Sequence, residues 1–169
     1  KNNKPVVYSI IEAGEFHLSN TKGRYLKLMG EIEQNGRFPL GEWKYLLQAG
    51  KTVGDVPYPL LKFIHGKGGG AHGFYEFSLM NNREYIADAY GALFTEVKTN
   101  GLIFNYIPLV KRLNLREMAS FKIAYGTLKN SHSQLIDIPT SSSRFSKPYS
   151  EVSVGICNLL SIFAIDSTW

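Results

Sequence analysis

The segment Leu115–Leu128 constrains the fold more than any other part of the sequence, because its side chains alternate in character. The odd positions are apolar: Ala119, Phe121, Ile123 and Tyr125. The even positions between them are polar or small: Ser120, Lys122 and Ala124. Side chains of a β-strand point alternately to its two sides, so this segment is predicted to be a strand with one apolar and one more polar face.

The preceding segment, Glu84–Thr99, shows the same period of two. One side carries Gly91, Leu93, Thr95 and Val97, and the other carries Glu96 and Lys98. Ionised groups that share one side of a strand require water or a partner of opposite charge. An apolar outside and a polar interior are typical of the wall of a membrane barrel. We therefore expect an all-β fold, an antiparallel transmembrane β-barrel or a part of one, with about seven strands in this chain.

Five further segments complete the predicted strands: Val6–Phe16, Arg24–Gln34, Glu42–Val53, Tyr149–Leu159 and Ile162–Trp169. Asn-Gly is a strong turn signal. We expect a turn from Asn35 to Gly41 between the second and third of the seven strands. The strands Glu84–Thr99, Leu115–Leu128 and Tyr149–Leu159 are predicted to be adjacent and antiparallel.

The connections between these strands differ in length. Gly54–Met80 and Thr127–Pro148 are long and polar, whereas Asn158–Ser161 is short and apolar. Outer-membrane barrels have long extracellular loops and short periplasmic turns. The Gly101–Leu115 connection then belongs to the periplasmic side, and Ile107–Leu113 is predicted to form a short amphipathic helical turn there.

Composition narrows the functional classes. The net charge is +5, and no cluster of five or more Lys or Arg is present, so we expect no nucleic-acid partner. Aromatic residues make up 13% of the chain, which suits strands ending in interfacial aromatic belts. No apolar run reaches the ~18 residues of a spanning helix. The single cysteine, Cys157, excludes an intramolecular disulfide.

Several short motifs, in one order, resemble a known family over about residues 24–169. They are Pro57-Tyr58-Pro59-Leu60-Leu61, Phe77–Tyr85, Asp88-x-Tyr90, Asn100-Gly101, Ile107-Pro108-Leu109, Leu115-Arg116-Glu117 and Pro148-Tyr149-x-Glu151-Val-x-Val-Gly155-Ile156. The chain resembles the outer-membrane proteins of Bacteroidota that carry an N-terminal carboxypeptidase-like regulatory domain and a C-terminal β-barrel of unassigned function. It departs from that family at Cys157-Asn158, where the family has a charged asparagine-containing pair.

The resemblance implies that residues 1–169 are the C-terminal barrel region, a fragment of a longer chain, located in the bacterial outer membrane. It implies a non-enzymatic protein with a role in transport, outer-membrane assembly or surface presentation. The implied partners are the lipid bilayer and other outer-membrane proteins, and no cofactor is implied. The family's barrel distantly resembles the class of surface antigens that insert and translocate outer-membrane proteins, which is an analogy of fold alone.

The alternation assigns side chains to two environments. Candidate lumen charges are Glu96, Lys98, Lys122 and Glu151. Glu31 and Glu33 are expected on the same face, and Lys27 and Lys44 are expected to neutralise such acids. The predicted lipid-facing side chains are Leu93, Val97, Phe121, Ile123, Val152, Val154 and Ile156.

The segment Pro57–Asn82 is the candidate gating loop, because loops beyond about 12–15 residues are usually functional or disordered. We expect its apolar ends, one of which begins with Pro57, Tyr58 and Pro59, to fold back into the barrel mouth. Arg83 and Glu84 are expected to tie the loop to the lumen charges. In an isolated fragment we expect this loop to lie open and the edge strands to be unpaired.

The sequence lacks the residue patterns of several other chemistries. His65, His72 and Glu76 have no metal-ligand spacing, and Gly66–Gly70 lacks the ending and the helix of a phosphate loop. Cys157 has no positioned base, and no Gly-x-Ser-x-Gly elbow exists. We therefore predict no catalytic, cofactor or metal site. The alternative function is a soluble antiparallel β-barrel that binds a small apolar ligand, because parity alone does not say which face points inward. An enzyme embedded in the barrel is a weaker third reading.

Overall fold

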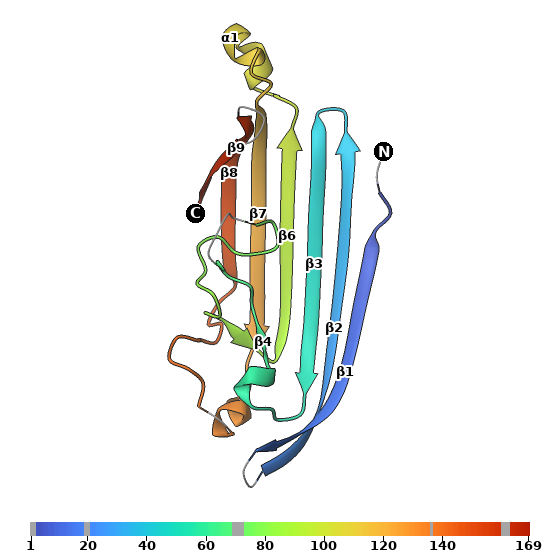
Figure 1. Cartoon of the computed structure of the whole chain (residues 1–169), viewed down its shortest axis with the longest axis vertical. Helices are drawn as coiled ribbons and strands as arrows, with labels where there is room; N and C mark the ends of the chain where they lie inside the picture. The colour runs from blue at the N-terminus through green and yellow to red at the C-terminus, as the bar shows by residue number, and fades with distance from the viewer. Residues whose placement is uncertain (1–2, 19–20, 69–72, 136, 160–162) are drawn as a thin grey trace.

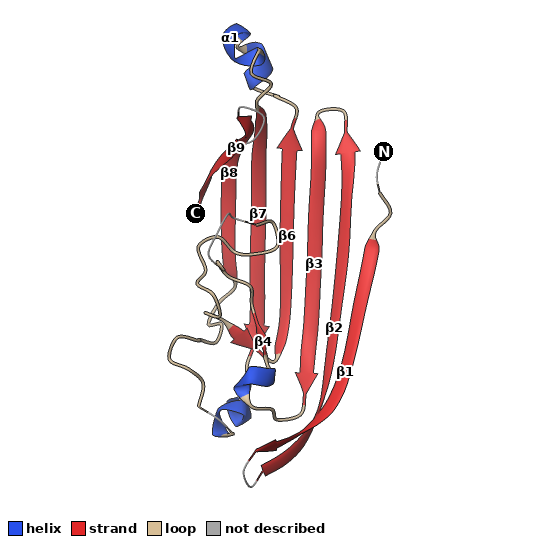
Figure 2. Cartoon of the chain, viewed as in Figure 1, coloured by secondary structure: helices blue, strands red, loops and turns tan. Residues whose placement is uncertain are grey.

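The computed structural model describes residues 3–18, 21–68, 73–135, 137–159 and 163–169, and over them the chain is all-β, as predicted. One antiparallel sheet holds seven strands in this order: β1 (Val6–Leu18), β2 (Thr21–Phe38), β3 (Gly41–Val53), β6 (Ala89–Thr99), β7 (Arg116–Thr127), β8 (Tyr149–Leu159) and β9 (Phe163–Thr168). A small second sheet pairs β4 (Lys62–Phe63) with β5 (Ile86–Ala87). Figures 1 and 2 show the long strands side by side.

The three strands predicted to be adjacent are neighbours: β6 pairs with β7, and β7 pairs with β8, both antiparallel. The first begins later than predicted, at Ala89. The chain just before it leaves the large sheet, because the backbone of Ile64 donates to Tyr85 and that of Ile86 donates to Ser143. Glu84–Thr99 is therefore divided between two sheets.

The turn predicted at Asn35–Gly41 is shorter than expected. β2 continues to Phe38, and Pro39 and Leu40 alone form the turn to β3. Asn35 and Gly36 stay in the ladder opposite Lys44 and Trp43, so pairing overrides the local turn signal. The helical turn predicted within Ile107–Leu113 is confirmed as α1 (Pro108–Lys111), which follows the 3₁₀ turn η2 (Phe104–Tyr106).

The sheet is open rather than closed into a barrel. In the described ranges β1 pairs with β2 alone and β9 pairs with β8 alone, so both outer edges are free. The expected unpaired edges are therefore present. In the same ranges, no helix has the length and apolar character needed to cross a membrane.

The core lies between one face of the sheet and the two long loops, which cross β6, β7 and β8 in Figure 1. Its largest cluster packs Phe77 and Met80 of the loop against Leu46 and Phe94 of the strands. Burying each such side chain stabilises the fold by about 1.5–3 kcal/mol. Phe77 and Met80 are fully buried, so the expectation of an open loop is wrong.

Candidate functional site

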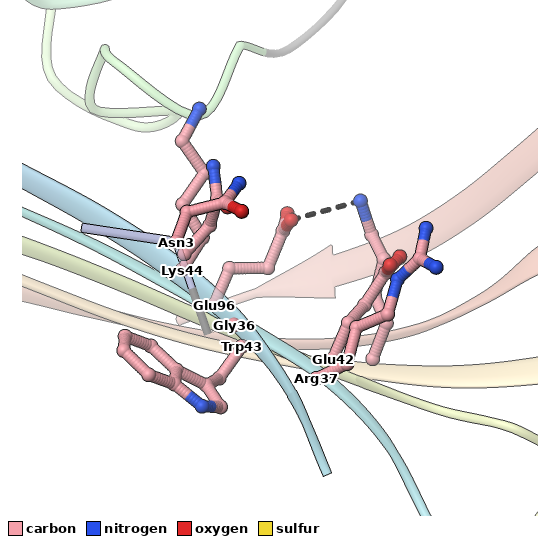
Figure 3. A pocket seen from close by; sticks show the side chains of 9 residues that line it. Asn3, Gly36, Arg37, Glu42, Trp43, Lys44 and Glu96 are labelled. Atoms are coloured by element: carbon pink, nitrogen blue, oxygen red, sulfur yellow. Dashed lines mark hydrogen bonds and ion pairs between the residues drawn. The ribbon is translucent and has the colours of Figure 1, made fainter. Parts of the chain in front are cut away.

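The two faces of the sheet differ in chemistry. We call the face beneath the loops the covered face and the opposite one the open face. The covered face carries most of the ionised side chains of the central strands, among them Lys27, Glu31, Glu33, Lys44, Glu96, Lys98, Lys122 and Glu151, whereas Lys51 of β3 lies on the open face. Figure 3 shows the alternation directly, with Lys44 and Glu96 on one side of the strands and the Trp43 ring on the other.

The open face is apolar over β6, β7 and β8. All seven side chains predicted to face lipid lie on it: Leu93, Val97, Phe121, Ile123, Val152, Val154 and Ile156. Phe121 is 40% exposed and Val154 is 48% exposed. Trp43 and Tyr45 stack on this face with ring centroids 5.8 Å apart. Their contact with lipid stays a prediction.

Glu151 is the centre of the contact between loop and sheet. Its side chain is buried, and the residue is 1% exposed. One carboxylate oxygen accepts a hydrogen bond from the backbone N–H of Ser78 at 2.7 Å, and the other accepts from Leu79 at 2.8 Å and Met80 at 3.3 Å. The Tyr149 hydroxyl donates at 2.9 Å. Four donors compensate a buried carboxylate for the water it has lost.

Lys122 lies opposite Glu151 in the β7–β8 ladder and holds the same loop from the other side. Its Nζ donates to the carbonyl oxygen of Gly73 at 3.1 Å and to that of Glu76 at 2.6 Å. Lys122 is 5% exposed. The carboxylate thus binds N–H groups of the loop, while the ammonium binds its carbonyls. The sheet therefore holds both the donors and the acceptors of the loop backbone.

A second attachment joins the loop to β2 and β3. Lys44 Nζ donates to the Tyr75 hydroxyl at 2.6 Å, and that hydroxyl donates to Glu33 at 3.1 Å. The ammonium also lies 4.3 Å from the ring centroid of Phe74 and 4.2 Å from that of Tyr75. The loop is therefore fastened at both sides of the covered face.

Among the described contacts, the other two candidate lumen charges pair with each other. Glu96 and Lys98 form an ion pair of 2.8 Å. They line a polar cavity of about 550 Å³, together with Arg37, Glu42 and Lys44 (Figure 3). The four charges share one face, but Lys122 and Glu151 hold the loop while Glu96 and Lys98 face a cavity.

Comparison with family models gives a match to the C-terminal domain of a family of unknown function (DUF5686), over residues 1–136. The chain belongs to this family. The matched range includes Lys122 and the whole loop, and Glu151 lies beyond it. No curated protein and no solved structure matches the chain.

In this DUF5686 domain, Arg83 and Glu84 stay within the loop region. The Arg83 guanidinium lies 5.5 Å from the Phe63 ring centroid. The backbone carbonyl of Arg83 accepts a hydrogen bond from the Ser142 hydroxyl. The Glu84 carboxylate accepts from the backbone and side chain of Asn81. Among the described contacts, it is those of Lys122 and Glu151 that attach the loop to the sheet.

Pro57, Tyr58 and Pro59 lie at the opposite end of the DUF5686 domain from α1. Tyr58–Leu60 form a 3₁₀ turn, η1, which begins after Pro57. Tyr58 packs against a small core of Val56, Leu61 and Ile86. This end of the loop is held by apolar packing rather than by charge.

Sequence reasoning missed a buried polar pair, Asp88 and His132. His132 Nδ1 accepts from the backbone N–H of Val56 at 3.1 Å, and its Nε2 lies 3.4 Å from Asp88 Oδ2. The Thr127 hydroxyl and the backbone N–H of Lys129 donate to Asp88. The pair joins both long loops to the start of β6. Asp88-x-Tyr90 was the available signal, but nothing in the sequence connects it to His132.

The histidines considered as metal ligands are not brought into a ligand set. His65 Nε2 lies 3.4 Å from Lys62 Nζ, and His72 lies outside the described residues. The described part of the DUF5686 domain holds no group of three or more His, Cys, Asp or Glu that could bind a metal. Burial, and then the positive charge of Lys62, lower the pKa of His65 below its ordinary value.

Proposed function

We propose that the seven-stranded sheet is a section of the wall of a transmembrane β-barrel in the bacterial outer membrane. The open face contacts lipid, and the covered face lines the lumen. The proposal rests on one observation: ionised side chains gather on the covered face, while the middle of the open face on β6, β7 and β8 carries none. A membrane barrel requires this order, and a water-soluble barrel requires the reverse.

The height of the apolar band supports the proposal. On β7 the open face is apolar from Ala119 to Tyr125, between Glu117 and Thr127. The six steps from Ala119 to Tyr125, at about 3.4 Å each, span about 20 Å. The apolar band of an outer-membrane barrel is about 25 Å tall. Trp43 and Tyr45 then belong to an aromatic girdle at one boundary.

In this proposal the segment Pro57–Asn82 is a plug that closes the lumen. Its docking uses the buried pair Lys122 and Glu151, which a wall facing only water does not need. Release of that contact opens the lumen, so the loop acts as a gate. The barrel is non-enzymatic and acts in transport, outer-membrane assembly or surface presentation, with the bilayer and other outer-membrane proteins as partners.

Barrel closure needs more than the seven described strands. The free edges of β1 and β9 expose unpaired backbone groups, which cannot remain unpaired in hydrocarbon. Further strands therefore complete the wall in the assembled protein.

The alternative, a soluble barrel that binds a small apolar ligand, draws on one observation. A shallow apolar hollow of about 760 Å³ lies on the open face, between Leu28 and Tyr125. Small residues form its floor in a row of register partners: Ser9, Gly30, Ala49 and Gly91. The hollow is on the outside of the loop-covered structure, whereas a ligand-binding barrel encloses its cavity.

Fractionation of the full-length protein tests the proposal. We expect recovery in the outer-membrane fraction and a gel mobility that changes on heating, as for folded membrane barrels. Recovery in the soluble fraction, with the same gel mobility before and after heating, would refute the proposal and favour the soluble alternative.

A further inference from the structure

The β6–β7 connection presents an unusual apolar surface. We call residues 100–115 the tip; in Figure 1 it projects beyond the end of the sheet and carries α1. Its large exposed apolar side chains are Leu102, Ile103, Tyr106, Ile107, Leu109 and Leu113. Tyr106 is 86% exposed and Leu109 is 82% exposed. Contiguous apolar surface of this kind marks an interaction site.

The tip is held in a defined shape rather than left as a loose turn. The Glu117 carboxylate accepts hydrogen bonds from the backbone N–H groups of Leu102 at 2.8 Å, Ile103 at 2.7 Å and Phe104 at 3.1 Å, and also from the Thr99 hydroxyl. The Asn158 side chain donates to the Asn114 carbonyl at 2.7 Å. These hydrogen bonds fix the backbone of the tip, so its exposed apolar side chains are held in defined positions.

The charge of the tip selects the kind of partner. Lys111 and Arg112 are exposed beside Leu109 and Leu113, and the sequence has no acidic residue between Asn100 and Leu115. Apolar and aromatic side chains with adjoining cations are the composition of segments that lie in a membrane interface. Each cation near an anionic membrane surface contributes about 1 kcal/mol.

The tip also adjoins the apolar open face, from which the Glu117 carboxylate at its base separates it. Val97 of β6 and Ala119 of β7 are cross-strand partners on that face, close to the point where both strands enter the tip. If the open face contacts lipid, as proposed above, the tip reaches the level of the lipid headgroups. We propose that the tip inserts its apolar side chains into the headgroup region of an anionic bilayer, with Lys111 and Arg112 against lipid phosphates. This inference rests on the proposed function.

The test uses the full-length protein with one environment-sensitive fluorophore, in a Cys157→Ser background that keeps a donor for the Arg116 carbonyl. The fluorophore is attached at Leu109→Cys in the tip or, as a control, at Phe121→Cys on the open face. Each variant is reconstituted in vesicles of phosphatidylcholine, in vesicles with added phosphatidylglycerol, and in detergent. Heat-dependent mobility verifies folding.

We expect the label at position 121 to be blue-shifted and protected from iodide in both kinds of vesicle. We expect the label at position 109 to be protected chiefly in the anionic vesicles, and Lys111→Gln with Arg112→Gln to remove that difference. Protection at 121 with free iodide access at 109 overturns the inference alone. Equal protection of position 109 in the neutral and the anionic vesicles also overturns it, because Lys111 and Arg112 then do not select an anionic surface. Iodide access at both positions overturns the proposed function as well.

Discussion

Lys122 and Glu151 are cross-strand partners whose opposite charges bind different peptide groups of one loop. Lys122 holds the carbonyls of Gly73 and Glu76, and Glu151 holds the N–H groups from Ser78 to Met80. Neither charge has to contact the other to be compensated. Both side chains bind the backbone of the same loop. The loss of either residue therefore weakens the docking of the loop that compensates the other buried charge.

The first prediction concerns this pair. Glu151→Ala removes the acceptor of three backbone N–H groups and leaves Lys122 as a buried charge without its counterpart. A buried donor left unsatisfied costs about 1–3 kcal/mol. We expect a lower free energy of unfolding in urea and rapid proteolysis between Gly73 and Met80.

The matched control is Ser150→Ala, one residue away and on the open face. It should leave both measurements unchanged. A Glu151→Ala protein whose loop resists proteolysis as well as the parent's would show that the carboxylate does not hold the loop.

The second prediction tests which face contacts lipid. Phe121→Arg places a charge in the middle of the open face, which costs about 2–4 kcal/mol if the site lies near the bilayer midplane. Ser120→Arg, on the adjacent residue, lies on the covered face, where Ser120 lines a second polar cavity together with Glu96 and Lys122. We expect a reduced yield of folding into vesicles for Phe121→Arg alone. The opposite ranking would invert the assignment of the faces.

The third prediction tests the gate. Deletion of Pro57–Asn82 removes Phe77, Met80 and every loop group that binds Lys122 and Glu151. We expect a higher single-channel conductance in planar bilayers. Deletion of Gly66–Gly73 leaves the three N–H donors to Glu151 in place and should keep conductance low. Equal, low conductance in both variants, with heat-dependent mobility retained, would refute the gate.

The fourth prediction follows from His65, whose pKa is lowered by burial and by Lys62. The docked state prefers the neutral imidazole, so it binds fewer protons than the undocked state. The docking free energy is therefore unaffected by this group above about pH 6.5, its ordinary pKa, and weakens as the pH falls from there until the lowered pKa is reached. We expect proteolysis of the loop to increase over that interval. His65→Gln should abolish this part of the pH dependence, and an unchanged profile would remove His65 as its cause.

The strands and their faces could be predicted because alternation is a local signal. Tyr149–Leu159 was predicted to the residue, and the short helix at Pro108–Lys111 lay inside its predicted range. Other features depend on contacts distant in sequence. Asp88 and His132 meet although they lie 44 positions apart in the sequence, and the Asn-Gly at 35–36 is drawn into a ladder that no local rule anticipates.

The candidate site was predicted in part for the same reason. Parity placed Lys122 and Glu151 on one face, but it could not assign them to the loop rather than to each other. Arg83 and Glu84 were expected at the loop's return because they are charged and adjacent to the strand. Backbone N–H groups at 78–80 carry the contact instead, and a sequence gives no sign of which amides will be free to bind.

The order of strands in the large sheet has a consequence for how the protein is made. Each long strand pairs with the strand that precedes or follows it among the seven, with no crossover between them. Pairing partners are therefore close in the chain, which keeps the entropy of loop closure low and favours rapid folding. The two longest closures, from β3 to β6 and from β7 to β8, also carry the loops that pack on the finished wall. Assembly can thus proceed hairpin by hairpin, and each free edge serves as the template for the next strand to arrive.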